Sequence, residues 1–186
     1  MFGEMSQEES SNPIEFSPRC ESIEGKRMRT LSKKTQYTLR ALYSLARSYG
    51  RGPTLIAKVA NEESIPQDFL ENILLYLKRE GLVESKKGKG GGYSLAKPPD
   101  QVTIGAIVRM MEGPLAPLPC ASETAYRKCD ECVDDRFCGT RMVMRQVRDA
   151  TAAILDRTTL AQVCLRVDEA RAQADAGDGG ALMFYI

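Results

Sequence analysis

The sequence predicts a mainly α-helical protein with one small β-hairpin and a long C-terminal helix. Apolar residues recur at helical spacing in five segments, which indicates helices that each bury one face. Between the third and fourth segments, two short extended stretches flank a run of lysines and glycines, the pattern of a hairpin with a flexible tip. No apolar run approaches the ~18 residues that a membrane-spanning helix needs, so no membrane partner is expected.

The first three helices are expected over residues 32–49, 54–62 and 66–80. Residues that start or stop helices lie at their ends, with Thr54 as a predicted N-cap and Gly81 as a C-terminal stop. Pro66 suits the first turn of the third helix, where its missing N–H costs nothing. The third helix is expected to bury Phe69, Leu70, Ile73, Leu74 and Leu77.

The hairpin is expected from extended stretches at 82–85 and 93–96, joined by the cationic loop 86–92. A fourth helix over 103–112 follows. The order helix, helix, turn, helix, hairpin, helix predicts a winged helix-turn-helix, with the hairpin as its wing.

Charge is unevenly distributed along the chain, although the net charge is only +1. Residues 28–99 carry thirteen basic and six acidic side chains, a net charge of +7, whereas 1–27 and 100–186 each carry −3. Such asymmetry indicates a polyanionic partner for the middle part, and we expect double-stranded DNA rather than RNA.

In a helix-turn-helix the second helix of the pair lies in the major groove, where its N-terminal residues meet base edges. Gln67 and Asn72 suit adenine, and Asp68 or Glu71 can accept from cytosine. Polar residues on a helix are more often a solvated face, and a hairpin is more often an ordinary turn. The combination of correctly ordered helices, a lysine-rich wing and a net charge of +7 nevertheless favours DNA binding. The glycine run at 88–92 lacks the Gly-Lys-Ser/Thr ending of a nucleotide-binding P-loop, so a nucleotide site is not expected there. The predicted DNA-binding residues are Pro66, Gln67, Asp68, Phe69, Glu71 and Asn72 of the helix with Lys86, Lys87, Gly88 and Lys89 of the wing.

A long helix over 140–163 carries Val143, Val147, Ala150 and Ile154 at coiled-coil spacing, which predicts a homodimer interface over packing on its own domain. Met28 is a candidate start of translation. The predicted parts are a disordered arm at 1–27, the DNA-binding domain at 28–112, a cysteine-rich sensor loop at 113–139, a dimerisation helix at 140–165 and a flexible tail at 166–186.

Four cysteines lie within nineteen residues of a chain that has no histidine: Cys120, Cys129, Cys132 and Cys138. The N-terminus has no secretory signal pattern, so a cytoplasmic location is expected, where clustered cysteines bind metals or are redox-active. Thiolates are ligands of iron–sulfur clusters and of structural zinc. The nearby basic residues are expected to lower the thiol pKa values: Arg127, Lys128, Arg136 and Arg141.

Residues 28–163 resemble the Rrf2 family of bacterial transcription regulators. The matching stretches are Met28-Arg29, Tyr37-Thr38-Leu39-Arg40, Phe69-Leu70-Glu71, Leu77-Lys78-Arg79-Glu80-Gly81-Leu82-Val83 and Gly88-Lys89-Gly90-Gly91-Gly92-Tyr93. The resemblance implies a homodimer joined through the long C-terminal helix and bound to a palindromic operator.

In the cluster-binding branch of this family, three loop cysteines hold an iron–sulfur cluster. The resemblance assigns Cys120 to the first and Cys138 to the last, with Cys129 or Cys132 between them. The family's fourth ligand is missing here, because Arg141 stands where one branch has histidine and Gln36 is nearest to where another has aspartate. The cluster type, 2Fe–2S or 4Fe–4S, and the ligand set therefore stay open.

The sequence thus predicts a dimeric transcription regulator, not an enzyme, whose operator affinity depends on an iron–sulfur cluster or on the redox state of the cysteine loop. The alternatives are a thiol–disulfide switch through Cys129 and Cys132, a zinc-dependent redox protein, or a constitutive DNA-binding module with no cofactor. An enzyme is disfavoured because the chain has no histidine and no βαβ pattern around these cysteines. Cys20 and Cys164 are expected to be free or packed thiols.

Overall fold

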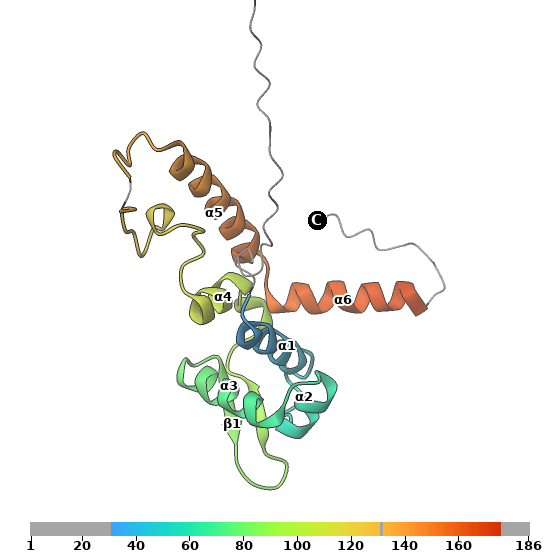
Figure 1. Cartoon of the computed structure of the whole chain (residues 1–186). Coiled ribbons are helices and arrows are strands. Elements are labelled where there is room, and N and C mark those ends of the chain that lie inside the picture. Colours follow the sequence, from blue (N-terminus) through green and yellow to red (C-terminus); the bar gives the residue numbers. More distant parts are fainter. Residues whose placement is uncertain (1–30, 131, 176–186) are drawn as a thin grey trace, which may run out of the picture. The chain divides into compact units, whose positions relative to one another are not determined.

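The computed structural model describes residues 31–130 and 132–175, so the predicted arm at 1–27 and Met28 lie outside the described part (Figure 1). The predicted fold class is confirmed, because the chain is mostly helical with a single two-stranded hairpin over these residues. The elements are α1 (Lys33–Arg47), α2 (Ile56–Glu62), α3 (Gln67–Arg79), β1 (Val83–Lys86), β2 (Gly92–Leu95), η1 (Pro99–Gln101), α4 (Ile104–Glu112), η2 (Pro119–Ala121), α5 (Gly139–Arg157) and α6 (Leu160–Asp175).

Helix α1 lies at the centre of the packing and contacts α2, α3, β2, α4 and α6. It begins at Ser32, whose hydroxyl accepts from the backbone N–H of Thr35 at 3.1 Å, a capping bond that satisfies one free donor of the first turn. Leu42 and Leu45 on its inner face are fully buried, and each contributes about 1.5–3 kcal/mol of burial free energy. The other large core residues come mainly from α3 and α4: Leu70, Ile73, Leu74, Leu77 and Ile107.

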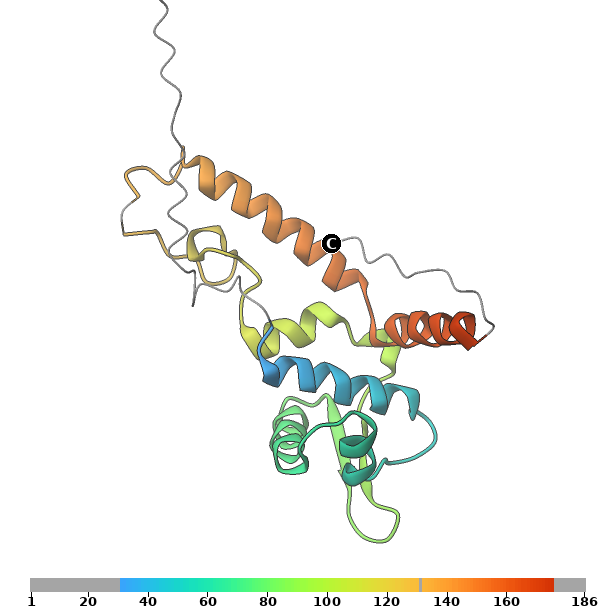
Figure 2. The same ribbon diagram turned by 45° about the vertical axis from the view of Figure 1, so that its right-hand side comes forward.

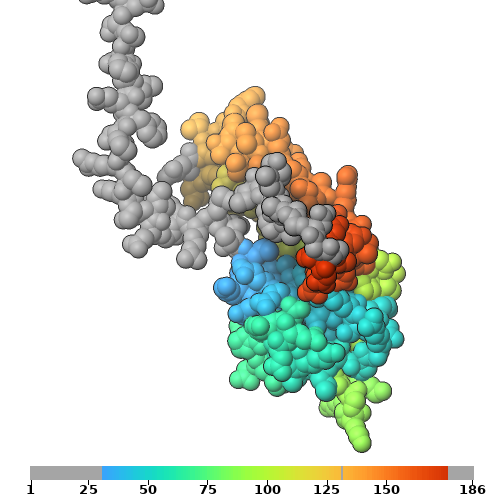
Figure 3. All heavy atoms as spheres, turned by 90° about the vertical axis from the view of Figure 1, so that its right-hand side faces the viewer, coloured from blue at the N-terminus to red at the C-terminus, as the bar shows by residue number. Residues whose placement is uncertain are grey.

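Strands β1 and β2 pair antiparallel, from Val83 opposite Leu95 to Lys86 opposite Gly92. Thr54 adds a third short extended segment, because its N–H donates to the Tyr93 carbonyl at 2.8 Å and its carbonyl accepts from the Tyr93 N–H at 2.9 Å. The expectation that Thr54 caps α2 was therefore wrong: the cap position is Leu55, which makes no side-chain capping bond. These bonds join the base of the wing to the start of α2. The loop of the wing extends beyond the helices (Figures 2 and 3).

The predicted single helix over 140–163 is divided into α5 and α6. Thr158 is extended, its carbonyl accepts from the Ile104 N–H at 2.8 Å, and the Leu160 N–H donates to the Val102 carbonyl at 2.9 Å. This pairing with the start of α4 competes with helix continuation and buries Leu160 completely. Helix α6 then runs through the first part of the predicted flexible tail, as far as Asp175. Within the described residues, no helix is both long and apolar enough to cross a membrane.

Candidate functional site

The exposed face of α3 carries the polar residues that the sequence singled out. Gln67, Asp68, Glu71 and Asn72 are exposed, because the opposite face of the helix buries its leucines and Ile73 in the core. Pro66 occupies the N-cap position, one residue before the helix. The Asn72 amide donates to the Asp68 carbonyl at 3.0 Å. The four side chains are therefore arranged on one solvent-facing surface.

Phe69 is not the buried core residue that the helical spacing suggested. Its relative exposure is 39%, and its ring meets the ring of Tyr37 edge-on with centroids 5.6 Å apart. The guanidinium of Arg40 lies over the other aromatic ring of the pair, 5.8 Å from the Tyr37 centroid. Phe69 thus lies at the border between α1 and α3, beside the exposed polar face.

The wing presents three exposed lysines, Lys86, Lys87 and Lys89. Its turn depends on glycine: Gly88 has φ +91°, a left-handed conformation that side chains disfavour, and its carbonyl accepts from the Gly91 N–H at 2.9 Å. At Gly92, an added Cβ would lie 2.3 Å from the Thr54 carbonyl oxygen. The glycines therefore allow a tight cationic tip and a close backbone approach at its base.

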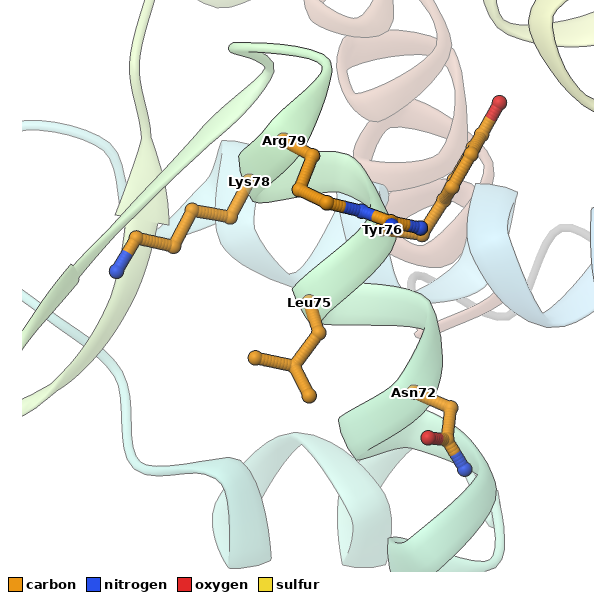
Figure 4. A pocket seen from close by; sticks show the side chains of 5 residues that line it. All are labelled: Asn72, Leu75, Tyr76, Lys78 and Arg79. Atoms are coloured by element: carbon orange, nitrogen blue, oxygen red, sulfur yellow. The ribbon is translucent and has the colours of Figure 1, made fainter.

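An open hollow on the α3 surface involves residues that the sequence analysis missed as candidate site residues (Figure 4). Leu75 is 48% exposed at its centre, and the Lys78 ammonium donates to the Ser85 hydroxyl of β1 at 2.6 Å. The signal was present in the sequence, because positions 75, 78 and 79 follow Asp68 and Asn72 at helical spacing. The hollow is lined by Asn72, Leu75, Tyr76, Lys78 and Arg79.

The structure brings the four loop cysteines into one neighbourhood. The pKa of the Cys129 thiol is raised, mainly because it shares a hydrogen bond with Cys120, and nearby Cys138 acts in the same direction. The pKa of the Cys132 thiol is raised by partial burial and then by Cys138. Cys120 is buried in η2, and Cys138 occupies the N-cap position of α5. Residues from both ends of the loop thus meet.

The expected lowering of thiol pKa values by nearby basic residues was wrong for Cys129 and Cys132. Only Lys128 favours the Cys132 thiolate, and its effect is smaller than those of burial and neighbouring thiols. Arg136 instead pairs with Asp134 at 2.9 Å. Over residues 31–130 and 132–175, no three histidine, cysteine or acidic side chains converge tightly enough to hold one metal ion.

Arg141 of α5 holds the two ends of the loop together. Its Nε donates to the Cys120 carbonyl at 2.9 Å, and its NH1 donates to the Asp135 carbonyl at 3.0 Å. Its guanidinium also lies 5.2 Å from the ring centroid of Tyr126. The pKa of Asp135 is lowered, first because Tyr126 donates a hydrogen bond to it and also by the charge of Arg141. Arg141 therefore acts as a structural clasp.

Arg148 makes a second clasp between α5 and the loop. Although Arg148 is a cation, only 7% of the residue is exposed, and its NH1 donates to the Ala121 carbonyl at 2.6 Å. Its other nitrogens reach Asp149 at 2.8 Å and Glu123 at 3.1 Å. The carbonyls of consecutive residues in η2 are thus bonded by two arginines of α5.

Helix α4 joins the cysteine loop to α5 and to α1. Arg109 forms a two-pronged ion pair with Asp156 of α5, at 2.5 and 2.8 Å, which lowers the pKa of the Asp156 carboxyl. At the end of α4, the Glu112 carboxylate accepts from the Ser32 N–H at 2.8 Å and from the Thr35 hydroxyl. The start of the cysteine loop is therefore anchored to the first turn of α1.

Helix α5 leaves its apolar stripe uncovered. Val143, Val147 and Ile154 are 52%, 43% and 67% exposed, and Arg148 is the only buried residue of the nineteen. Helices in folded proteins normally bury their apolar stripe, so the exposed stripe of α5 calls for a partner surface.

Comparison with known proteins finds transcriptional regulators of one family. A family model described as "Rrf2: Iron-dependent Transcriptional regulator" matches residues 31–166. An rrf2-like HTH-type transcriptional regulator of Rhodobacter capsulatus is 41% identical over 133 residues, which cover 70% of this chain and 89% of that protein. The HTH-type transcriptional regulator CymR of Bacillus subtilis is 33% identical over 156 residues, which cover 84% of this chain and 99% of that protein.

Solved structures agree with the sequence matches. The structure of CymR (YrzC), the global cysteine regulator of B. subtilis, has a TM-score of 0.63 at 31% identity and covers 75% of this chain and 98% of that one. The structure of IscR from T. potens has a TM-score of 0.61 at 30% identity and covers 76% of this chain and 90% of that one. The winged helix arrangement is therefore shared with both.

Proposed function

Because the chain belongs to the Rrf2 family of transcriptional regulators, we propose that it is a cytoplasmic homodimer that binds a double-stranded operator and responds through its cysteine loop. Its relatives are regulators of transcription and not enzymes. The observation that carries the sensing part is the meeting of four thiols in one loop that is bonded to α5 at both ends.

Operator binding uses the exposed face of α3 and the wing. The side chains at the start of α3 point away from the core and lie on a part of the chain with a charge of +7. Gln67, Asp68, Glu71 and Asn72 would meet base edges, with Pro66 and Phe69 beside them. The lysines of the wing, with Gly88 at its turn, would reach phosphates or the minor groove.

The dimer uses the uncovered stripe of α5. Val143, Val147 and Ile154 would be removed from water against the same residues of a second copy. A two-fold symmetric dimer joined through α5 would also place one winged helix on each half of a palindromic operator.

The loop residues fit an iron–sulfur cluster by their donor chemistry. Cys120, Cys129, Cys132 and Cys138 would hold it, since the chain has no histidine and Arg141 is engaged with carbonyl oxygens. When bound, such a cluster supplies a centre that changes charge with redox state and is lost on oxidation.

This chain's residues would carry the change to the DNA-binding part. Arg141 and Arg148 bind the loop to α5, and the ion pair between Arg109 and Asp156 joins α5 to α4. The loaded and empty loops would favour different positions of α4, and the operator would select between them by its differential affinity.

A thiol–disulfide switch without a metal is the second candidate. The influence of Cys120 on the pKa of Cys129 and of Cys138 on the pKa of Cys132 favours these two pairs over the Cys129–Cys132 pair expected from the sequence. This switch would need an oxidant that accepts two electrons and two protons for each disulfide formed.

The test begins with protein purified without oxygen, assayed for visible absorption, iron, sulfide and zinc. We expect thiolate-to-iron charge-transfer bands that are lost in Cys138→Ser and retained in Cys164→Ser, a matched control buried on α6. Operator duplexes selected from a random pool should bind loaded and empty protein with different affinities. Equal affinities in both states, and after thiol oxidation, would leave only a constitutive DNA-binding module.

A further inference from the structure

Two cations of different helices lie over one aromatic ring at the edge of the α3 surface. The Lys34 ammonium of α1 is 4.8 Å from the ring centroid of Tyr76, and the Arg79 guanidinium of α3 is 5.7 Å from it. Both cations are exposed, and Figure 4 shows the Arg79 side chain extending alongside the Tyr76 ring. Stacking on a ring orders a long basic side chain while leaving its N–H donors available.

The ring that aligns these cations is itself fixed. Tyr76 is half-buried against the core, and its hydroxyl donates to the Met110 carbonyl of α4 at 3.2 Å. A ring held at both its face and its hydroxyl keeps Lys34 and Arg79 at a constant spacing. The hollow beside the ring also contains Asn72, one of the predicted base-reading residues.

Among residues 31–130 and 132–175, no acidic side chain neutralises these two cations. Other basic residues of the same domain pair with acids: Arg40 and Arg47 with Glu63, and Lys58 with Glu62. Over the described ranges, no carboxylate lies within 4 Å of Lys34 or Arg79. An aligned and unneutralised pair of cations beside a DNA-reading helix suits an anion with several oxygens, such as a backbone phosphate.

We propose that Lys34 and Arg79, aligned on the ring of Tyr76, form a clamp for a phosphate of the operator backbone. The clamp rests on the proposed DNA-binding function and adds to it a contact beyond the base-reading residues and the wing. Arg79 lies seven residues after Asn72 and eleven after Asp68, so the clamp extends the same face of α3 toward its C-terminal end. Lys34 brings the first turn of α1 into the interface.

The measurable signature of a phosphate contact is salt dependence. For B-DNA the slope of log K against log salt concentration changes by about 0.9 for each phosphate charge that is neutralised. Replacing both cations, which are proposed to hold one phosphate, should therefore reduce the slope by about 0.9 per protomer. The contact does not depend on base sequence, so a duplex of mixed sequence serves as the probe.

The experiment measures binding of the full chain to a fluorescent mixed-sequence duplex across a range of salt concentrations. We expect a reduced slope for Lys34→Gln/Arg79→Gln and a wild-type slope for Arg166→Gln/Arg171→Gln, which makes the same charge change on exposed positions of α6. Tyr76→Leu, which removes the ring, should also reduce the slope, whereas Tyr76→Phe retains the ring and should preserve it. Thermal unfolding of each variant confirms that it is folded.

A wild-type slope in the double variant or in Tyr76→Leu would overturn the clamp, and so would an equal reduction in the α6 control. If the wild-type protein binds neither this duplex nor any selected operator, the proposed function fails along with it. Binding by wild type together with an unchanged slope in the variants refutes the clamp alone.

Discussion

Arg148 is the residue whose replacement tests most directly how the cysteine loop is held. Arg148→Met retains the aliphatic stem but removes the guanidinium that donates to the Ala121 carbonyl at 2.6 Å. Ala121 is 1% exposed, so water cannot easily replace the lost donor. A buried acceptor left without a partner costs about 1–3 kcal/mol.

We therefore expect Arg148→Met to lower the free energy of unfolding by about 2 kcal/mol. For a chain of this size, about 2–4 °C of melting temperature corresponds to each kcal/mol, so the midpoint should fall by about 4–8 °C. Arg145→Met is the matched control, because Arg145 is exposed one turn earlier on α5, and it should change stability by less than ~0.5 kcal/mol.

The assay is urea and thermal unfolding of metal-free protein, followed by circular dichroism at a fixed protein concentration well above that of dimer dissociation. Metal-free protein separates the clasp from any stabilisation by a bound cofactor. Equal unfolding free energies for the Arg148 and Arg145 variants would refute the conclusion that Arg148 holds the loop.

Three other predictions concern the wing, the α4–α5 contact and the dimer. Gly92→Ala should cost more than ~2 kcal/mol and weaken DNA binding, because its Cβ would lie 2.3 Å from the Thr54 carbonyl oxygen, whereas Gly139→Ala meets no atom within 4 Å and should leave thermal stability nearly unchanged. Hydrogen bonds from Arg109 hold the pKa of Asp156 in the folded protein below its value in the unfolded chain. The Asp156 carboxylate therefore stabilises the fold fully at pH values above the unfolded-chain pKa. This stabilisation is lost as the pH falls through the pKa of the folded protein. Asp156→Asn should accordingly lower urea stability at pH 6, by less than ~1 kcal/mol since the pair is partly exposed, and converge with wild type in strong acid. Ile154→Glu should convert a dimer to a monomer in light scattering, whereas Leu165→Glu, an equally apolar exposed position on α6, should not; a dimer that survives Ile154→Glu would exclude the α5 stripe as its interface.

The local elements could be predicted from the sequence, because helical spacing and glycine-rich turns depend on neighbouring residues. The division between α5 and α6 could not, because it arises from pairing with the start of α4, and Thr103 and Thr159 are far apart in sequence. Phe69 was misassigned because Leu70 next to it has the same apolar character, and periodicity alone does not determine which of them faces the core.

The candidate site, too, could be predicted only in part from the sequence. The number and spacing of the cysteines predicted a thiol site, and the structure adds which thiols are neighbours, such as Cys120 and Cys129. The roles of Arg141 and Arg148 had no sequence signal, because their acceptors are backbone carbonyls, which every residue possesses. The charge of Arg141 suggested an effect on thiol ionisation, whereas the bonds of Arg141 and Arg148 hold the loop.

The bond from Arg141 to the Cys120 carbonyl joins residues twenty-one positions apart and so makes the cysteine segment a closed ring before any metal arrives. Bringing together the ends of a flexible segment of this length costs about 3 kcal/mol of chain entropy from the length-dependent part alone. Protein contacts already meet that cost, so binding of the proposed cluster would not have to. Emptying the ring would likewise leave its ends together and the surrounding fold intact. The proposed cluster would then be lost and regained without an unfolded state, and the closed segment would pass the change through α5 to α4.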